Sequence, residues 1–190
     1  MKRVLLLLAV LLVGATTVMG QQDKAAEKAA KKAEKAAKKA AEEAAGNALF
    51  KQAVEALNDR DFVVEADRVE FKRGRFVYVT PSTNFVSMDG NRATIQLAFN
   101  VAASGPNGIG GITVEGTTNN VRMKTDKKGN VTYSFMVQGV AVSASVTIRM
   151  VKGTNKCTAT VNPNFNSNRV SFTGNLYPSD QSNVFKGRAF

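Results

Sequence analysis

The spacing of hydrophobic residues changes once along the chain, from a helical period to a strand period. Residues 23–45 are almost entirely Ala, Lys and Glu and carry no stripe of large apolar side chains, which is typical of a solvated helix. After Gly46, apolar residues recur at a spacing that places them on one face of a helix, which predicts a short amphipathic helix. These residues are Leu49, Phe50, Ala53, Val54 and Leu57. Beyond Asp61, apolar and polar residues alternate with a period of two, which predicts strands.

Short alternating segments separated by turn residues predict an antiparallel β domain. The alternation is clearest in residues 131–137 and 140–150, and turn signals such as Gly74, Gly90 and Gly129 separate the segments. No helical pattern alternates with these strands, so a parallel α/β fold is not expected. The predicted fold is therefore mainly β, an antiparallel β-sandwich or a partly closed β-barrel, preceded by the long Ala/Lys/Glu helix and the short amphipathic helix.

The N-terminus has the layout of a secretory signal peptide. Lys2 and Arg3 precede the apolar run 4–13, and Val18 and Gly20 stand at the −3 and −1 positions before Gln21. The apolar run is shorter than the roughly 20 residues that span a bilayer, so no transmembrane segment is expected after cleavage. We expect an exported protein of the periplasm or cell surface, divided into a signal peptide (1–20), a helical spacer (21–45) and a β domain with its amphipathic helix (46–190).

The chain is basic, with 26 Lys and Arg against 15 Asp and Glu and a net charge of +11. Three clusters at predicted strands and turns favour an anionic envelope component or simply solvated turns: Lys72, Arg73 and Arg75; Lys124, Lys127 and Lys128; Arg149, Lys152 and Lys156. No aromatic-rich recognition motif accompanies them, so nucleic acid is not expected as a partner. The single cysteine, Cys157, excludes an internal disulfide and alternates with Ala159 and Val161, as a buried thiol would.

A glycine-rich stretch, GPNGIGGITVEG at 105–116, invites comparison with phosphate-binding loops. Gly108, Gly110 and Gly111 do not keep the dinucleotide spacing, and the β-branched run after them offers no helix N-terminus to a phosphate. We expect a connection between strands, with a pocket rim as the alternative.

Catalytic constellations are scarce in this sequence. The chain has no histidine, which removes the commonest general base, and one cysteine cannot form a zinc site. No catalytic residue, cofactor or metal is therefore predicted. A carboxylate-dependent hydrolase using Glu65, Asp67 or Glu115 is the remaining enzymatic alternative.

Four stretches resemble a known family. They are NFVSMDGNRATIQLAF (84–99), GIGGITVEGTTNNVRM (108–123), KKGNVTYSFMVQG (127–139) and RVSFTGNLYP (169–178). Together they resemble the secreted domain of unknown function 4251 of Bacteroidetes-type bacteria, over about Leu49 to Tyr177. The resemblance implies a signal peptide and a compact β domain with an N-terminal helix, and it implies no catalytic residues.

Two non-enzymatic hypotheses follow. In the first, the β module binds a small apolar ligand or an anionic envelope component. Its cavity would be lined by Ile95, Leu97, Phe99, Val131, Tyr133 and Phe135, residues that could equally fill a core. In the second, the protein has a structural or interaction role and uses the Ala/Lys/Glu helix as a spacer.

Overall fold

The computed structural model describes residues 2–99, 110–140, 143–164 and 168–189, with residues 2–26 described by their backbone only. The chain divides into two compact units, Met1–Ala45 and Gly46–Phe190. One helix, α1 (Lys2–Asp59), forms the first unit and its last turns belong to the second. Over the residues whose side chains are described, no helix is both long enough and apolar enough to cross a bilayer.

The Ala/Lys/Glu part of α1 is helical and solvated. All side chains from residue 27 to residue 45 are exposed. Lys31 pairs with Glu27 at 2.6 Å and Lys39 with Glu43 at 3.7 Å, both at i,i+4 spacing. Such exposed pairs contribute a few tenths of a kcal/mol each, so helix propensity accounts for most of the local order.

The last turns of α1 pack within the second unit. Ala53 and Leu57 are buried in its core, and Phe50 and Val54 pack against that core, as the amphipathic pattern predicts. Leu49, which the same pattern places on this face, is 40% exposed instead. The helix ends at Asp59, and the next residue, Arg60, adopts a positive φ of 57°.

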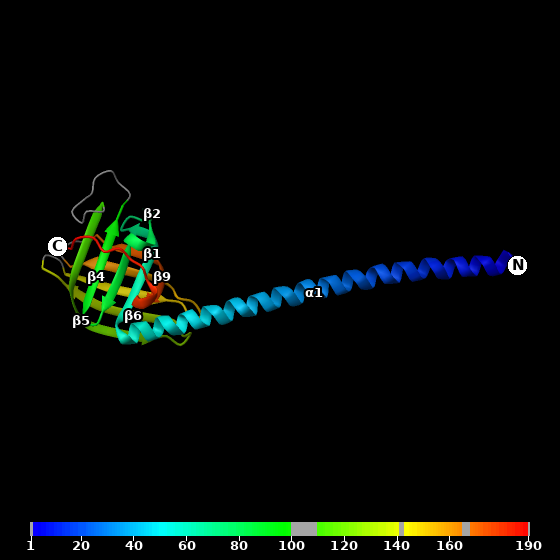
Figure 1. The fold of residues 1–190 in the computed structure, drawn as a ribbon, viewed down its shortest axis with the longest axis horizontal. Coiled ribbons are helices and arrows are strands. Elements are labelled where there is room, and N and C mark those ends of the chain that lie inside the picture. Colours follow the sequence, from blue (N-terminus) through cyan, green and yellow to red (C-terminus); the bar gives the residue numbers. More distant parts are fainter. Residues whose placement is uncertain (1, 100–109, 141–142, 165–167, 190) are drawn as a thin grey trace. The chain divides into compact units, whose positions relative to one another are not determined.

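The described residues that follow the helix form nine strands. Figure 1 shows these strands wrapped around a common interior. They are β1 (Asp61–Phe71), β2 (Phe76–Tyr78), β3 (Phe85–Asp89), β4 (Arg92–Ala98), β5 (Gly111–Thr125), β6 (Val131–Gln138), β7 (Ser143–Met150), β8 (Lys156–Pro163) and β9 (Val170–Pro178). A short 3-10 helix, Pro81–Thr83, precedes β3, and another, Ser179–Gln181, follows β9.

The sheet closes into a barrel because β1 pairs with both β3 and β9. Eight antiparallel strands form the barrel in the order β1-β3-β4-β5-β6-β7-β8-β9, and β2 is an additional strand paired with β1. The prediction of a mainly β antiparallel fold is confirmed, and of its two forms the barrel is correct, fully rather than partly closed. We call the end at which α1 leads into β1 the helical end, and the end at which β1 finishes at Phe71 the distal end.

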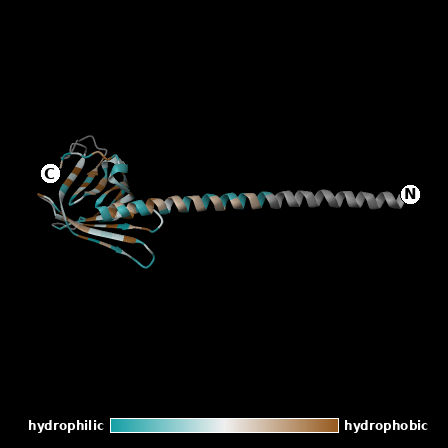
Figure 2. Cartoon of the chain, turned by 60° about the horizontal axis from the view of Figure 1, so that its bottom comes forward, coloured by the Kyte–Doolittle hydropathy of each residue, from teal (hydrophilic) through white to brown (hydrophobic). Residues whose placement is uncertain are grey.

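Alternate side chains fill the barrel interior. In β6 the inward residues Val131, Tyr133, Phe135 and Val137 are all buried, and this alternation gives the bands of hydropathy along the strands in Figure 2. The ring of Phe62 meets those of Tyr133 and Phe135 edge to face, with centroids 5.6 and 6.5 Å apart. Such edge-to-face pairs stabilise a core beyond their buried area.

The outer face of the barrel is partly covered by the C-terminal segment, residues 179–189. Register places Glu65, Phe85, Gln96 and Thr113 next to one another across β1, β3, β4 and β5. Phe85, Gln96 and Thr113 are almost fully buried although they point away from the interior. Ser182, Phe185, Lys186 and Gly187 bond to this part of the barrel, which accounts for that burial.

Candidate functional site

A cleft of about 730 Å³ lies at the distal end of the barrel. Its walls come from the β1–β2 turn and from the residues that lead into β9: Phe71, Lys72, Arg73, Arg75, Asn168, Arg169 and Val170. We call it the cationic cleft. Two other clefts among the described residues are smaller, at about 580 and 250 Å³.

Local hydrogen bonds fix the β1–β2 turn. The amide of Gly74 donates to the carbonyl of Phe71 at 2.9 Å, and the amide of Phe71 donates to the carbonyl of Arg75 at 2.8 Å. Gly74 has a φ of 75°, a conformation that favours glycine. The turn therefore holds Lys72, Arg73 and Arg75 on a defined backbone, and all three side chains are exposed.

The fourth cation arrives from a distant part of the sequence. Phe71 is the cross-strand partner of Val170 at the closing seam between β1 and β9. This register places Arg169 beside the turn, and Arg169 also lines the cleft. Phe71 and Val170 give the cleft an apolar floor that packs against the core.

The charge of the cationic cleft has one sign. Four of its lining residues are Lys or Arg and none is Asp or Glu. The acidic residue on the adjoining strand, Glu70, is paired with Arg68 at 3.2 Å. A concave surface with several cations attracts anions, and guanidinium groups donate paired hydrogen bonds to carboxylate or phosphate oxygens. The arrangement can hold an anionic group against an apolar floor.

The predicted cavity-lining residues lie mainly in the core. Ile95, Val131, Tyr133 and Phe135 are buried in the hydrophobic core cluster, and Leu97 packs against it. Burial raises the pKa of the Tyr133 phenol, whose hydroxyl lies 3.5 Å from the sulfur of Met88.

The sixth predicted lining residue, Phe99, lies at the distal end instead. Its ring packs against that of Phe71 with centroids 6.0 Å apart. It also lines a second cleft, of about 580 Å³, with Ala98 and residues 77–80 and Thr83.

Two glycines of the predicted pocket rim are described, and Gly108 lies outside the described residues. Gly110 has a φ of 83° and precedes β5. At Gly111 an added Cβ would come within 1.8 Å of the carbonyl oxygen of Leu97, so the strands β4 and β5 approach closely there. Neither glycine lines the cationic cleft or the two smaller clefts.

The candidate carboxylates of a hydrolase are engaged separately. Glu65 accepts a hydrogen bond from the hydroxyl of Ser182 at 2.6 Å, and Asp67 is exposed on β1. Glu115 pairs with Lys186 at 2.5 Å and with Arg92 at 3.7 Å. Over the described residues, no group of three His, Cys, Asp or Glu side chains could hold a metal ion. Glu65 and Glu115 thus bind the C-terminal segment.

The pKa of Glu115 lies below its ordinary value of 4.5. The hydrogen bond from Lys186 is the largest cause, and the positive charges of Lys186 and Arg92 add to it against the opposing effect of burial. A carboxyl whose pKa is lowered stays ionised near neutral pH, which makes it a poor general acid.

Replacing Glu115 with glutamine is expected to remove a contribution to stability that depends on pH. Because the folded pKa is lowered, this contribution is fully present above pH 4.5 and is lost as pH falls through the folded pKa. The unfolding free energies of the wild type and Glu115→Gln should differ by up to about 1 kcal/mol at neutral pH and converge in acid. Urea titrations between about pH 3 and pH 7 measure this difference, with the exposed Glu55→Gln as the control. A difference that stays constant with pH would contradict the assignment.

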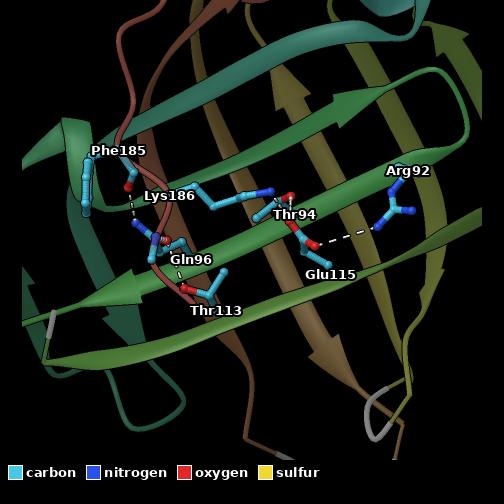
Figure 3. Close-up of polar contacts among 8 residues, drawn as sticks. Arg92, Thr94, Gln96, Thr113, Glu115, Phe185 and Lys186 are labelled. Carbon is cyan, nitrogen blue, oxygen red and sulfur yellow. Dashed lines mark hydrogen bonds and ion pairs between the residues drawn. The ribbon is translucent and has the colours of Figure 1, made fainter. Parts of the chain in front are cut away.

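Gln96 is the polar residue that sequence reasoning missed. It is fully buried on the outer face, where Figure 3 shows it between Phe185 and Thr113. Its Nε2 donates to the carbonyls of Phe185 at 2.7 Å and Thr83 at 3.0 Å. Its Oε1 accepts from the hydroxyl of Thr113 and the amide of Gly187, both at 2.8 Å. All four bonding positions of the amide are used, so it fixes the C-terminal segment to β4 and β5.

Cys157 lies in the core with Ala159 and Val161, on the face that the alternation predicts. Its side chain is buried, and this burial raises the pKa of the thiol to about 12. A thiol with so high a pKa carries almost no thiolate at neutral pH and is a poor nucleophile.

The protein is a closed eight-stranded antiparallel barrel preceded by a helix, with clefts on its surface. The family model of DUF4251, a domain of unknown function, matches residues 44–176. The chain is also similar to a crystal structure of a DUF4251 family protein from Bacteroides eggerthii DSM 20697, with 46% identity and a TM-score of 0.65. That match covers 78% of this chain and 99% of the other. The chain belongs to the DUF4251 family, as the sequence resemblance indicates. No curated protein matches it.

Proposed function

We infer that the protein is an exported, non-enzymatic binding module whose cationic cleft takes a small anionic ligand with an apolar group. The observation that carries this function is the composition of the cleft, which combines four cations, no carboxylate and an apolar floor. Carboxylate, sulfate and phosphate groups are the anions that paired guanidinium donors bind well. The ligand is an anionic envelope component of this chemical class.

The packing of the barrel supports binding at its distal end. Buried side chains fill the barrel interior, and the rings of Phe62 and Phe135 are in contact there. An apolar group of the ligand therefore finds its contacts at Phe71 and Val170, while the charged group meets Arg73 and Arg169.

Sequence features support the export and the absence of catalysis. The basic residues, apolar run and small residues before Gln21 have the order of a cleavable signal. The chain contains no histidine, and the carboxylates Glu65 and Glu115 are engaged by the C-terminal segment. A binding module needs neither a general base nor a free carboxylate, so these features agree with the proposed function.

Octyl phosphate is expected to raise the melting temperature of the chain that begins at Gln21. At a hundredfold excess over Kd, binding to the folded state adds about 2.7 kcal/mol, which corresponds to a rise of about 5 °C or more. Octyl glucoside, which has the same alkyl chain and no charge, is expected to leave the melting temperature unchanged. Thermal unfolding followed by circular dichroism measures both.

The variant Arg73→Ala/Arg169→Ala is expected to abolish the shift. Lys127→Ala/Lys128→Ala removes two exposed cations at the helical end and serves as the matched control. An equal rise with octyl glucoside, or an undiminished rise in Arg73→Ala/Arg169→Ala, would overturn the proposed function.

A further inference from the structure

The strand β2 exposes an apolar surface beside the cationic cleft. Phe76, Val77 and Tyr78 are 52, 36 and 79% exposed, although such side chains are usually covered. The rings of Phe76 and Tyr78 meet edge to face with centroids 5.8 Å apart. The guanidinium of Arg68 lies 5.2 Å from the centre of the Phe76 ring, which holds that ring on the surface.

The β1–β2 turn connects this aromatic surface to the cationic cleft. Phe76 directly follows Arg75, a lining residue of the cleft, and pairs with Glu70 on β1. The second cleft is lined by Val77 and Tyr78 of β2 together with Phe99. Ile112, at the start of β5 on the same distal end, is 51% exposed. Cations and exposed apolar side chains therefore share one end of the barrel.

We propose that the distal end of the barrel docks on the surface of an anionic lipid bilayer. Lys72, Arg73, Arg75 and Arg169 meet the phosphate groups of the lipids, and Phe76 and Tyr78 enter the interface between headgroups and acyl chains. This inference rests on the proposed function, because it identifies the anionic ligand of the cleft as a lipid headgroup within a membrane.

Charge and amphipathicity together favour a bilayer over a protein partner. Anionic bilayers attract each nearby Lys or Arg, and the attraction falls off within a Debye length. Tyrosine prefers the level of the headgroups, where its apolar ring and its polar hydroxyl are both satisfied, and phenylalanine adds apolar contact with the acyl chains. The distal end offers these two kinds of residue side by side, and the Tyr78 hydroxyl supplies the polar edge.

The absence of tryptophan from the chain permits a local test. In Tyr78→Trp the new indole is the only tryptophan and reports the environment of β2. The chain should begin at Gln21, since the apolar residues 4–13 would bind lipid by themselves. Residues 1–45 form a separate compact unit, so the chain that begins at Gln21 keeps every residue of the barrel core.

Vesicles of phosphatidylglycerol are expected to shift the Tyr78→Trp emission to the blue, and brominated acyl chains to quench it. Vesicles of phosphatidylcholine are expected to do neither. Val151→Trp, at an exposed position of the helical end, is the matched control and should not respond. Because the indole reports its own surroundings, attraction of the lysines in residues 23–45 to the vesicles does not produce the signal.

Charge reversal tests the role of the cleft. In the Tyr78→Trp chain, Arg73→Glu/Arg169→Glu is expected to lower the vesicle partition coefficient about tenfold or more, and raised salt should act in the same direction. Lys127→Glu/Lys128→Glu should leave the blue shift in place.

Several results would overturn the inference. They are an absent blue shift with phosphatidylglycerol, an equal shift with phosphatidylcholine, or an equal response from Val151→Trp. If octyl phosphate still stabilises the chain in that case, the cleft binds a soluble anion and the proposed function stands without the membrane. If octyl phosphate also fails, both are wrong.

Discussion

Replacing Gln96 with leucine is expected to lower the free energy of unfolding by about 3 kcal/mol or more. Leucine has a similar size, so the main change is chemical. The carbonyls of Thr83 and Phe185, the hydroxyl of Thr113 and the amide of Gly187 each lose a hydrogen-bonding partner. Each buried polar group left without a partner costs about 1 to 3 kcal/mol, and solvent entering under the C-terminal segment reduces that sum.

The measurement is a urea titration at neutral pH, with Gln138→Leu as the control. Gln138 lies at the end of β6 and its side chain is exposed, so its replacement should change stability by less than about 0.5 kcal/mol. Native-state trypsin digestion adds a second result, because Lys186 and Arg188 lie in the C-terminal segment. Trypsin is expected to cleave after Lys186 and Arg188 faster in Gln96→Leu than in the wild type, under conditions in which the barrel is still folded. Equal stability and equal cleavage in the two variants would show that Gln96 does not hold the segment.

The strands could be predicted because their alternation records burial on one face. In β7 the inward residues Ala144, Val146 and Ile148 are buried, as the sequence pattern predicts. The pattern states which face is inside and does not state what covers the outside. Gln96 occupies an outward position in an alternating run, and such a position by itself indicates a solvated side chain. Its burial depends on Phe185, which is 89 positions away in the chain.

The composition of the cationic cleft was only partly predictable for the same reason. Lys72, Arg73 and Arg75 are neighbours in sequence and formed a recognisable cluster. Arg169 joins them through the pairing of Phe71 with Val170, which exists only when the barrel closes. The β1–β9 pairing that closes the barrel contains a shift in register between Ala66 and Arg68, a local irregularity that a period-two pattern cannot encode.

Gly174 occupies the seam that this closure creates, and Gly174→Ala is expected to destabilise the protein by about 3 kcal/mol or more. An added Cβ would lie 1.9 Å from the carbonyl oxygen of Glu65 and 2.9 Å from the Cα of Ala66. Both atoms belong to the backbone of β1, so no side-chain rotation relieves the overlap. The two strands would have to separate beside the register shift, where β9 pairs with β1 and β8.

The sign of the change in unfolding free energy on Gly174→Ala distinguishes this close approach of two strands from a glycine with free space around it. Alanine restricts the unfolded chain, and at a site with free space Gly→Ala stabilises by about 0.4 to 1 kcal/mol. Urea titration of Gly174→Ala gives the sign directly, and a chain too unstable to titrate agrees with the expected loss. Thr173→Ala, on the neighbouring residue of β9, is the control and should remain within about 1 kcal/mol of the wild type. Unchanged or increased stability in Gly174→Ala would mean that β1 and β9 do not approach so closely. The closing seam would then no longer explain how Arg169 reaches the cleft beside Arg73, because the same pairing of β1 with β9 places both residues there.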